Sequence, residues 1–263
     1  MITSQEHFVA FIDILGFADF VKNETSKNVF DYLSTLTSVP NELNLPILDY
    51  NIQIFSDSVV VSVPVKNNFS EWREFLLYIN ALQLTSITES NLSKLPLRGA
   101  IAKGEFFTDN KDLTFGKAFI RAHELESRLA FYPRIVVDPI AKSNELQPED
   151  SRKTTEEMNN LLAQNGWDKK IAGGLKDFDE HSHLVRRDSD GLLHCNYLTS
   201  LRFVDGSWAN NAGARIEKHK QFIIDNLEKA PNERISAKYN WMKTYHNWFC
   251  AGYPETHTFK IKD

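Results

Sequence analysis

The stretch that decides the fold is Phe8–Phe17, which reads FVAFIDILGF. Apolar residues lead up to a single carboxylate, Asp13, and the run closes on Ile-Leu-Gly-Phe. A short apolar run bounded by glycine predicts a buried strand that ends in a turn. A carboxylate inside such a strand is costly to desolvate unless a partner compensates it. Two explanations stay open: backbone N–H groups cap Asp13, or Asp13 holds a metal ion at the strand end.

Length and composition narrow the class of protein. The chain has 263 residues, 42% of them apolar and 25% charged, as in an ordinary globular protein. A formal net charge of −5 argues against a general nucleic-acid binder but allows a nucleotide bound through metal ions. Two distant cysteines, Cys195 and Cys250, fit a reducing compartment. With no basic leader and no long apolar run, we expect a cytoplasmic protein without a membrane partner.

The order of the expected elements predicts the architecture. Strands are expected at 8–15, 52–55, 59–63, 97–107 and 135–137, and helices at 20–36, 71–91 and 116–129. With a further short strand before the last helix, the order is β-α-β-β-α-β-β-α-β. That order is typical of an α/β protein of the α+β kind, with a mixed sheet and helices on one face.

A change in composition follows this region. Ser143–Thr155 is polar and interrupted by proline, Asp190-Gly191 is a hairpin signal, and helical patterns follow at 211–227 and 232–249. We therefore expect a core over residues 1–143. Residues 144–263 should form a mostly helical extension that packs on the core and is not an independent domain.

A second carboxylate, Asp57, supplies a partner for Asp13. It lies in the polar turn Ser56-Asp57-Ser58 between two apolar strands, which is a hairpin signature. If the first strand lies beside this hairpin, the strand-end Asp and the turn Asp converge. Two nearby carboxylates repel unless a cation sits between them, and Mg²⁺ or Mn²⁺ takes oxygen ligands while leaving positions open for phosphate. The alternative is that Asp57 only forms the turn.

Four motifs in order make residues 8–138 resemble the class III nucleotidyl cyclases. The first-strand motif is matched by Phe11–Phe17, the hairpin motif by Phe55–Ser58, the Leu-Arg strand by Leu97–Gly104, and the glycine-initiated helix by Phe115-Gly116. The resemblance implies a ferredoxin-like mixed sheet and two Mg²⁺ or Mn²⁺ ions per site. It further implies that Asp13 and Asp57 bridge the ions and that the Ile14 carbonyl adds a ligand. Backbone N–H groups of Leu15, Gly16 and Phe17 would then cradle phosphate.

The sequence also departs from the family pattern. Ile120 and Glu124 stand where the family helix usually carries Asn and a transition-state Arg. Arg121 and Arg128 are the nearest substitutes for that catalytic role, and we favour Arg121; the alternative for Arg121 is a solvated helix face with a Glu124–Arg128 ion pair. Gln53 and Leu113 stand where adenine-specific members carry Lys and Asp. Gln53, which both donates and accepts hydrogen bonds, and Tyr50, which can stack, are then the candidates for base recognition.

Two further motifs resemble the Pycsar pyrimidine cyclases of bacterial anti-phage defence. They are residues 116–126 (GKAFIRAHELE) and residues 238–242 (KYNWM). The resemblance implies a homodimer with sites at its interface, which converts UTP or CTP to cyclic UMP or cyclic CMP. The product would activate a separate cyclic-nucleotide-responsive effector. The alternatives are an adenylyl or guanylyl cyclase, or a degenerate cyclase-like module that binds nucleotide without catalysis.

Overall fold

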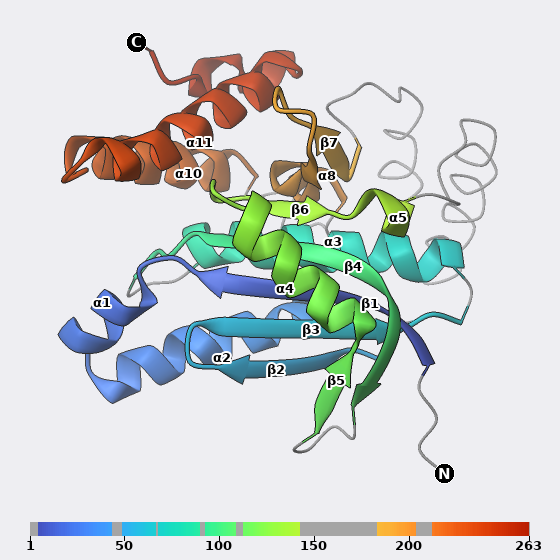
Figure 1. Ribbon diagram of the computed structural model, residues 1–263. Helices are drawn as coiled ribbons and strands as arrows, with labels where there is room; N and C mark the ends of the chain where they lie inside the picture. The colour runs from blue at the N-terminus through green and yellow to red at the C-terminus, as the bar shows by residue number, and fades with distance from the viewer. Residues whose placement is uncertain are drawn as a thin grey trace.

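The protein is built on one mixed β-sheet with helices on both of its faces (Figure 1). The structure is a computed structural model that describes residues 5–43, 49–66, 68–89, 93–108, 113–142, 183–203 and 212–262. Strand order is β2-β3-β1-β4-β6-β8-β7, and β5 pairs with β4. The strands are β1 (Gln5–Ile14), β2 (Asn51–Phe55), β3 (Ser58–Pro64), β4 (Leu97–Thr108), β5 (Thr114–Gly116), β6 (Ile135–Val137), β7 (Val185–Arg187) and β8 (Leu193–Cys195).

Strand β1 is central to this sheet. It pairs antiparallel with β3 on one side and with β4 on the other, while β4 and β6 are parallel. Phe8, Val9, Ala10 and Ile12 are all fully buried. A strand that is covered on both faces needs apolar side chains at consecutive positions, which explains the unbroken run at its start. The expected class, an α+β protein with a mixed sheet, is confirmed.

The expectation that helices cover only one face is wrong. Alternate β1 residues point to opposite sides: Phe8, Ala10 and Ile12 join the main core, whereas Val9 packs with Ala118 in a second core. The main core lies under α2 (Ser26–Leu43) and α3 (Asn68–Thr88), and the second core lies under α4 (Lys117–Leu129). Figure 1 views the sheet from the α4 side, with α2 and α3 behind it.

The first expected helix is divided in two. α1 (Phe17–Asn23) ends where the Glu24 N–H donates to the Phe20 carbonyl, and α2 then begins at Ser26. Glu24 is extended, so the chain leaves helical geometry between the two segments. The chain has a polar cluster at this point, Asn23, Thr25 and Ser26, whose side chains carry the local hydrogen-bonding groups that favour helix ends.

The chain after residue 182 adds to the same sheet and the same core. The β7–β8 hairpin joins the sheet through β6, with Val136 opposite His194. Ile216 and Tyr245 of the last two long helices belong to the main core. The helical segments are α5 (Pro139–Lys142), η2 (Tyr197–Thr199), α8 (Ser200–Phe203), α10 (Ala212–Glu228), α11 (Glu233–Ala251) and η3 (Pro254–Phe259). The expected polar connection at 143–155 lies outside the described residues.

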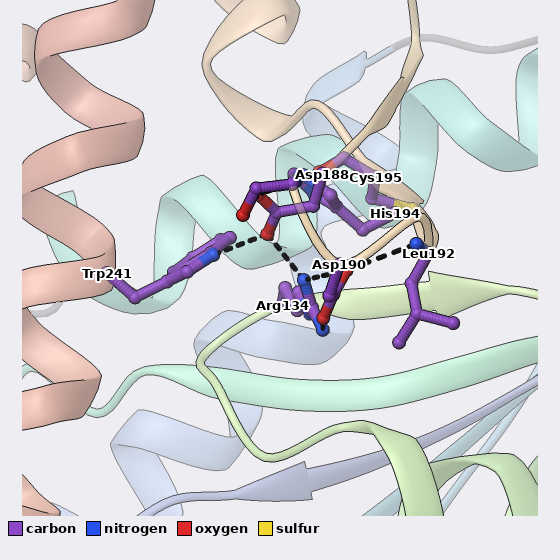
Figure 2. Close-up of polar contacts among 8 residues, drawn as sticks. Arg134, Asp188, Asp190, Leu192, His194, Cys195 and Trp241 are labelled. Atoms are coloured by element: carbon purple, nitrogen blue, oxygen red, sulfur yellow. Dashed lines mark hydrogen bonds and ion pairs between the residues drawn. The ribbon is translucent and has the colours of Figure 1, made fainter.

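A buried arginine joins α11 and the β7–β8 hairpin to the loop that precedes β6 (Figure 2). Arg134 is 1% exposed, and its guanidinium forms ion pairs with Asp188 and Asp190 of the hairpin turn. Trp241 of α11 donates its indole N–H to the Asp188 carboxylate at 2.6 Å. Burying a charge is costly unless it is paired, and here two carboxylates pair with the two Nη atoms of the guanidinium. The cluster therefore links α11 to the β7–β8 hairpin and to the loop before β6.

No helix in the described part of the chain is long and apolar enough to cross a membrane.

Candidate active site

The structure brings Asp13 and Asp57 together at one end of the sheet. Asp13 is the penultimate residue of β1 and lies opposite Ser58, the first residue of β3. The next residue, Ile14, donates its backbone N–H to the Asp57 carbonyl at 2.8 Å. A strand-end carboxylate and a hairpin-turn carboxylate thus come from adjacent backbone positions on neighbouring strands.

The hairpin turn that carries Asp57 is tight. Phe55 and Ser58 are directly paired, so only Ser56 and Asp57 form the loop, and Ser56 has a φ of +57°. Positive φ at the first loop residue is usual in two-residue hairpins because it matches the twist of the strands. Asp57 is half-buried, and its carboxylate has no hydrogen-bond or ion-pair partner among the described residues. Its side chain is therefore available to an added cation.

Asp13, in contrast, already has a partner that the sequence reasoning missed. Arg98 lies directly opposite Asp13 on β4, and its Nε is 2.7 Å from Asp13 Oδ2. The same Nε is 3.1 Å from Oε1 of Glu126, a buried residue of α4. The cost of desolvating Asp13 is thus offset by a half-buried guanidinium, which a second carboxylate fixes. Arg98 belongs to the Leu-Arg strand motif at Leu97–Gly104. Antiparallel pairing of that strand with β1 would have placed Arg98 opposite Asp13.

The expected phosphate cradle is present only in part. The Leu15 N–H donates to the Pro96 carbonyl at 3.0 Å, so it is not free to bind a substrate. Gly16 has a φ of +82°, a conformation that glycine adopts without strain, and α1 begins immediately after it. In the described chain, the backbone N–H groups of Gly16 and Phe17 have no internal acceptor. The Phe17 side chain is buried in the main core and anchors this turn.

Arg121 does not reach Asp13 within one chain. Its Nε is 2.7 Å from the Asp138 carboxylate, which lies just past β6. The Asp138 N–H donates to the Ile101 carbonyl, three residues along β4 from the Arg98 that pairs with Asp13. At the rise of an extended strand that offset is about 10 Å. Within this chain Arg121 is therefore engaged by Asp138, away from the pair of aspartates.

The two candidates for base recognition lie on opposite faces of the sheet. Tyr50 packs against the main core on the α3 side, with its ring 4.7 Å from that of Tyr78. Burial raises its pKa well above the usual value. Gln53 lies opposite Val60, a residue of the second core, and so belongs to the α4 side. The two side chains therefore do not form one base pocket in a single chain.

Gln53 instead contacts the β4–β5 hairpin. Its amide oxygen accepts a hydrogen bond from Thr114 at 2.7 Å, and its amide nitrogen donates to Thr108 at 3.3 Å. This contact shows that the hairpin folds across the sheet to reach the edge strand β2. Both ends of the Gln53 amide are thereby engaged by threonine hydroxyls.

The residues at the strand end fit a hard divalent cation. The donors are the carboxylates of Asp13 and Asp57 and the carbonyl of Ile14, all of them oxygen atoms of the kind that Mg²⁺ and Mn²⁺ prefer. Arg98 engages Oδ2 of Asp13, which leaves Oδ1 for another ligand. No group of three or more His, Cys, Asp or Glu gathers among the described residues. Substrate phosphates and water would complete the coordination, as is usual for Mg²⁺.

Comparison with known proteins gives distant structural likeness only. No protein-family model matches the chain, and no curated protein matches it in sequence. Similar solved structures include the guanylyl cyclase Cya2, at 14% identity over 53% of this chain and 78% of that one, with a TM-score of 0.41. The adenylyl cyclase CyaB from P. aeruginosa is 16% identical over 54% of this chain and 81% of that one, with a TM-score of 0.40. The guanylate cyclase domain of RhGC from Catenaria anguillulae, in complex with GTP, is 13% identical over 53% of this chain and 81% of that one, with a TM-score of 0.41.

Proposed function

We propose that this protein is a nucleotidyl cyclase that converts a pyrimidine nucleoside triphosphate to the 3′,5′-cyclic monophosphate. The observation that carries the proposal is the meeting of Asp13 and Asp57, through the Asp13–Ser58 pair and the hydrogen bond from Ile14 to Asp57. In the reaction, the ribose 3′-oxygen forms a bond to the α-phosphorus and loses its proton. The bond from that phosphorus to the β-phosphate oxygen breaks, and pyrophosphate leaves.

Asp13, Asp57 and the Ile14 carbonyl are the residues that would hold Mg²⁺ or Mn²⁺. Bound cations of this kind lower the pKa of a hydroxyl and neutralise charge on phosphate oxygens. Arg98 keeps the Asp13 carboxylate oriented, and Glu126 keeps Arg98 in place. The N–H groups of Gly16 and Phe17 would donate to phosphate oxygens, as backbone N–H groups at a glycine turn commonly do.

The proposal includes a homodimer with sites at its interface. An exposed apolar surface supports it, which we call the arm patch: Leu113, Phe115 and Ile120, together with the half-buried Phe107 that packs against Phe115. Leu113, Phe115 and Ile120 are each more than half exposed, at 58, 53 and 59%. Several exposed apolar groups on the β4–β5 hairpin and on α4, which follows it directly, are typical of a surface that another protein covers. A head-to-tail dimer would also bring Arg121 of one chain to the aspartates of the other.

The choice of a pyrimidine base rests on the sequence resemblance and on the residues at the adenine-reading positions. Leu113 is apolar and exposed, so it supplies no hydrogen bond to a base. Gln53 lies opposite Val60 on the same face as Phe11, and its amide would exchange its contacts with Thr108 and Thr114 for the donor and acceptor of a pyrimidine edge. The cyclic UMP or cyclic CMP produced would act as a second messenger for a separate effector in anti-phage defence.

The proposal is tested with purified protein, Mn²⁺ and each of the four common nucleoside triphosphates in separate reactions. Pyrophosphate release is measured, and products are identified by mass spectrometry. Faster cyclisation of UTP or CTP than of ATP and GTP is expected. A clear preference for ATP or GTP would replace the pyrimidine assignment with adenylyl or guanylyl cyclase activity. If all four triphosphates survive but bind, the protein is a non-catalytic nucleotide-binding module.

A further inference from the structure

The guanidinium of Arg98 lies between two carboxylates that approach the same nitrogen atom. Its Nε donates a hydrogen bond to Oδ2 of Asp13 at 2.7 Å, and Oε1 of Glu126 lies 3.1 Å from that Nε. This Oε1 accepts no hydrogen bond among the described residues, whereas the other oxygen, Oε2, accepts one from Ser127 at 3.1 Å. Because Nε carries a single hydrogen, Asp13 holds the hydrogen bond and Glu126 contacts only the charge of the guanidinium.

The oxygen without a hydrogen bond belongs to a buried carboxylate. The side chain of Glu126 is 6% exposed and lies in the last turn of α4. The preceding residue, Leu125, packs with Ala100 of β4 in a third small core, so this end of α4 is attached to the strand that carries Arg98 (Figure 1). A buried acceptor that lacks a hydrogen bond is unfavourable, so the site already contains an alternative acceptor for the Arg98 Nε–H.

The end of α4 attracts the guanidinium in a second way. Nη1 of Arg98 is 3.5 Å from the carbonyl oxygen of Ala130, the residue that follows α4 directly. The last carbonyl groups of a helix carry partial negative charge and interact favourably with cationic side chains. Arg98 thus has two acceptors on the α4 side, Glu126 and the Ala130 carbonyl, in addition to Asp13 on β1.

Asp13 needs both of its carboxylate oxygens if it bridges two cations, as the proposed function implies. In two-metal sites a shared carboxylate binds one ion through each oxygen, and at Asp13 the Oδ2 atom is already occupied by Arg98. A cation that approaches Oδ2 also repels the guanidinium. Both effects favour release of Oδ2 by Arg98, and Glu126 is the carboxylate that can receive the released Nε–H.

We propose that Arg98 transfers its Nε hydrogen bond from Asp13 to Glu126 when the second divalent cation binds. This inference rests on the proposed function and deepens it by assigning Glu126 as a positioning residue for metal loading. The exchange keeps the guanidinium paired with a carboxylate before and after loading, so no buried charge is left without a partner. Glu126 then favours binding of the second cation although it touches neither cation nor substrate.

The test measures Mn²⁺ binding to the full-length protein by calorimetry, with Mn²⁺ alone as the probe. Two binding steps are expected for each chain. Glu126→Gln should weaken the second step roughly tenfold, as expected for one lost charge-assisted hydrogen bond, and leave the first step within twofold of wild type. Glu228→Gln is the matched control, since Glu228 is exposed at the end of α10 and the charge change is identical. Equal weakening of both steps by Glu126→Gln would indicate a general effect of charge and would overturn the exchange.

A double-mutant cycle tests whether Glu126 acts through Arg98. Arg98→Met keeps an apolar stem but leaves Oδ2 of Asp13 free, so Glu126→Gln should no longer change the second Mn²⁺ step in that background. An undiminished effect would overturn the proposal. A crystal structure of wild-type protein with Mn²⁺ needs no variant: Arg98 Nε should lie within hydrogen-bond distance of Glu126 and no longer of Asp13. Retention of the Asp13–Arg98 hydrogen bond with two ions bound would also overturn it.

The kinetic readout separates this proposal from the cyclase proposal on which it rests. Glu126→Gln should raise the Mn²⁺ concentration that gives half-maximal activity roughly tenfold, while kcat at saturating Mn²⁺ changes less. If triphosphate is cyclised but Glu126→Gln leaves both Mn²⁺ steps within twofold of wild type, the exchange is wrong and the cyclase proposal stands. If no triphosphate is cyclised but the second Mn²⁺ step depends on Glu126 through Arg98, the exchange stands and the cyclase proposal fails. If wild-type protein binds fewer than two Mn²⁺ ions per chain, the exchange is overturned.

Discussion

At the scale of single residues, the candidate site depends on how the carboxylate of Asp13, at the end of β1, is compensated. Asp13 occupies a position that an apolar side chain would fill more cheaply, and Arg98 compensates for it from the adjacent strand. Asp57 has no such partner in the described chain. A cation bound between the two would give Asp57 a partner and would use Oδ1 of Asp13, which is the physical reason for expecting a divalent cation here.

Asp57→Ala should reduce cyclisation by more than about a hundredfold, since it removes a carboxylate proposed to hold the cations. The free energy of unfolding should change by less than about 1 kcal/mol because the side chain lies in a hairpin turn. Pyrophosphate release and urea unfolding measure the two effects. Gross unfolding of the variant would show that Asp57 is needed for the turn and would leave its metal role unsupported.

Gly99→Ala should destabilise the protein by about 1–3 kcal/mol because of backbone overpacking. A Cβ atom at this position would lie 2.4 Å from the Phe11 carbonyl oxygen and 2.9 Å from the Ile12 Cα, so β1 and β4 would have to separate. Gly213→Ala is the control: its Cβ would meet only Phe259 Cζ at 3.6 Å, and alanine favours the helix. Urea unfolding measures the free energy of unfolding of both variants. Equal values for Gly99→Ala and Gly213→Ala would contradict the steric argument.

At the scale of elements, α10 and α11 meet through a buried chain of hydrogen bonds. His219 Nδ1 is 2.9 Å from His246 Nδ1, and the Tyr197 hydroxyl is 2.7 Å from His219 Nε2. His246 Nε2 is 3.0 Å from the Phe259 carbonyl. One assignment satisfies every partner: Tyr197 donates to His219, His219 donates to His246, and His246 donates to the carbonyl. Both imidazoles are neutral in that arrangement.

The stability of this helix pair should fall as the pH drops below about 6.5. Burial lowers the pKa of His219 and of His246 relative to their values in the unfolded chain. A lowered pKa of a folded group gives stability that is present above the unfolded pKa and is lost as the pH falls. Burial lowers the pKa of His194 to about 4 and acts in the same direction. Urea unfolding between pH 7.5 and 5.5 measures the change.

His219→Gln isolates the contribution of the pair. The variant should be less stable than wild type at pH 7.5, and the difference should shrink toward pH 5.5, since glutamine does not titrate. Comparison with wild type is necessary because Glu74 acts in the opposite direction: burial raises its pKa to about 7, so its contribution is lost as the pH rises. A difference that does not vary with pH would contradict the assignment of neutral histidines.

At the scale of the whole molecule, the arm patch should form the dimer interface. Ile120→Glu would bury an unpaired charge there, which should weaken dimerisation roughly a hundredfold and reduce cyclase activity with it. Phe30→Glu is the matched control because Phe30 is 69% exposed on α2, a different element. Sedimentation velocity and pyrophosphate release report the two effects. A monomeric wild-type protein, or a dimeric Ile120→Glu variant, would contradict this interface.

Mixing two inactive variants tests whether Arg121 acts across that interface. Asp57→Ala and Arg121→Ala should each be inactive as homodimers. A mixed dimer has one site with both residues intact, so an equal mixture should recover about a quarter of wild-type activity, as two-fold symmetry requires. The activity of each variant alone, at the same total protein concentration, provides the baseline. Lack of recovery, when the mixed dimer is shown to form, would exclude an action of Arg121 from the partner chain.

The sequence by itself determined the order of the core elements and the approach of Asp57 to Asp13. Hydrophobic periodicity and turn residues are local signals, and a hairpin turn beside a strand end leaves little freedom in where its carboxylate lies. It also contained, unused, the reason for helices on both faces: a strand with apolar side chains at consecutive positions must be covered on two sides.

The tertiary structure alone decided the partners of that strand. The pairing of Arg98 with Asp13, the burial of Glu126 beside it, and the separation of Tyr50 from Gln53 follow from strand register and from alternation across the sheet. The attachment of α11 to the sheet includes the ionic cluster around Arg134, which joins segments about 50 to 100 residues apart in the chain. Such contacts depend on packing between distant elements, for which the local sequence carries no signal.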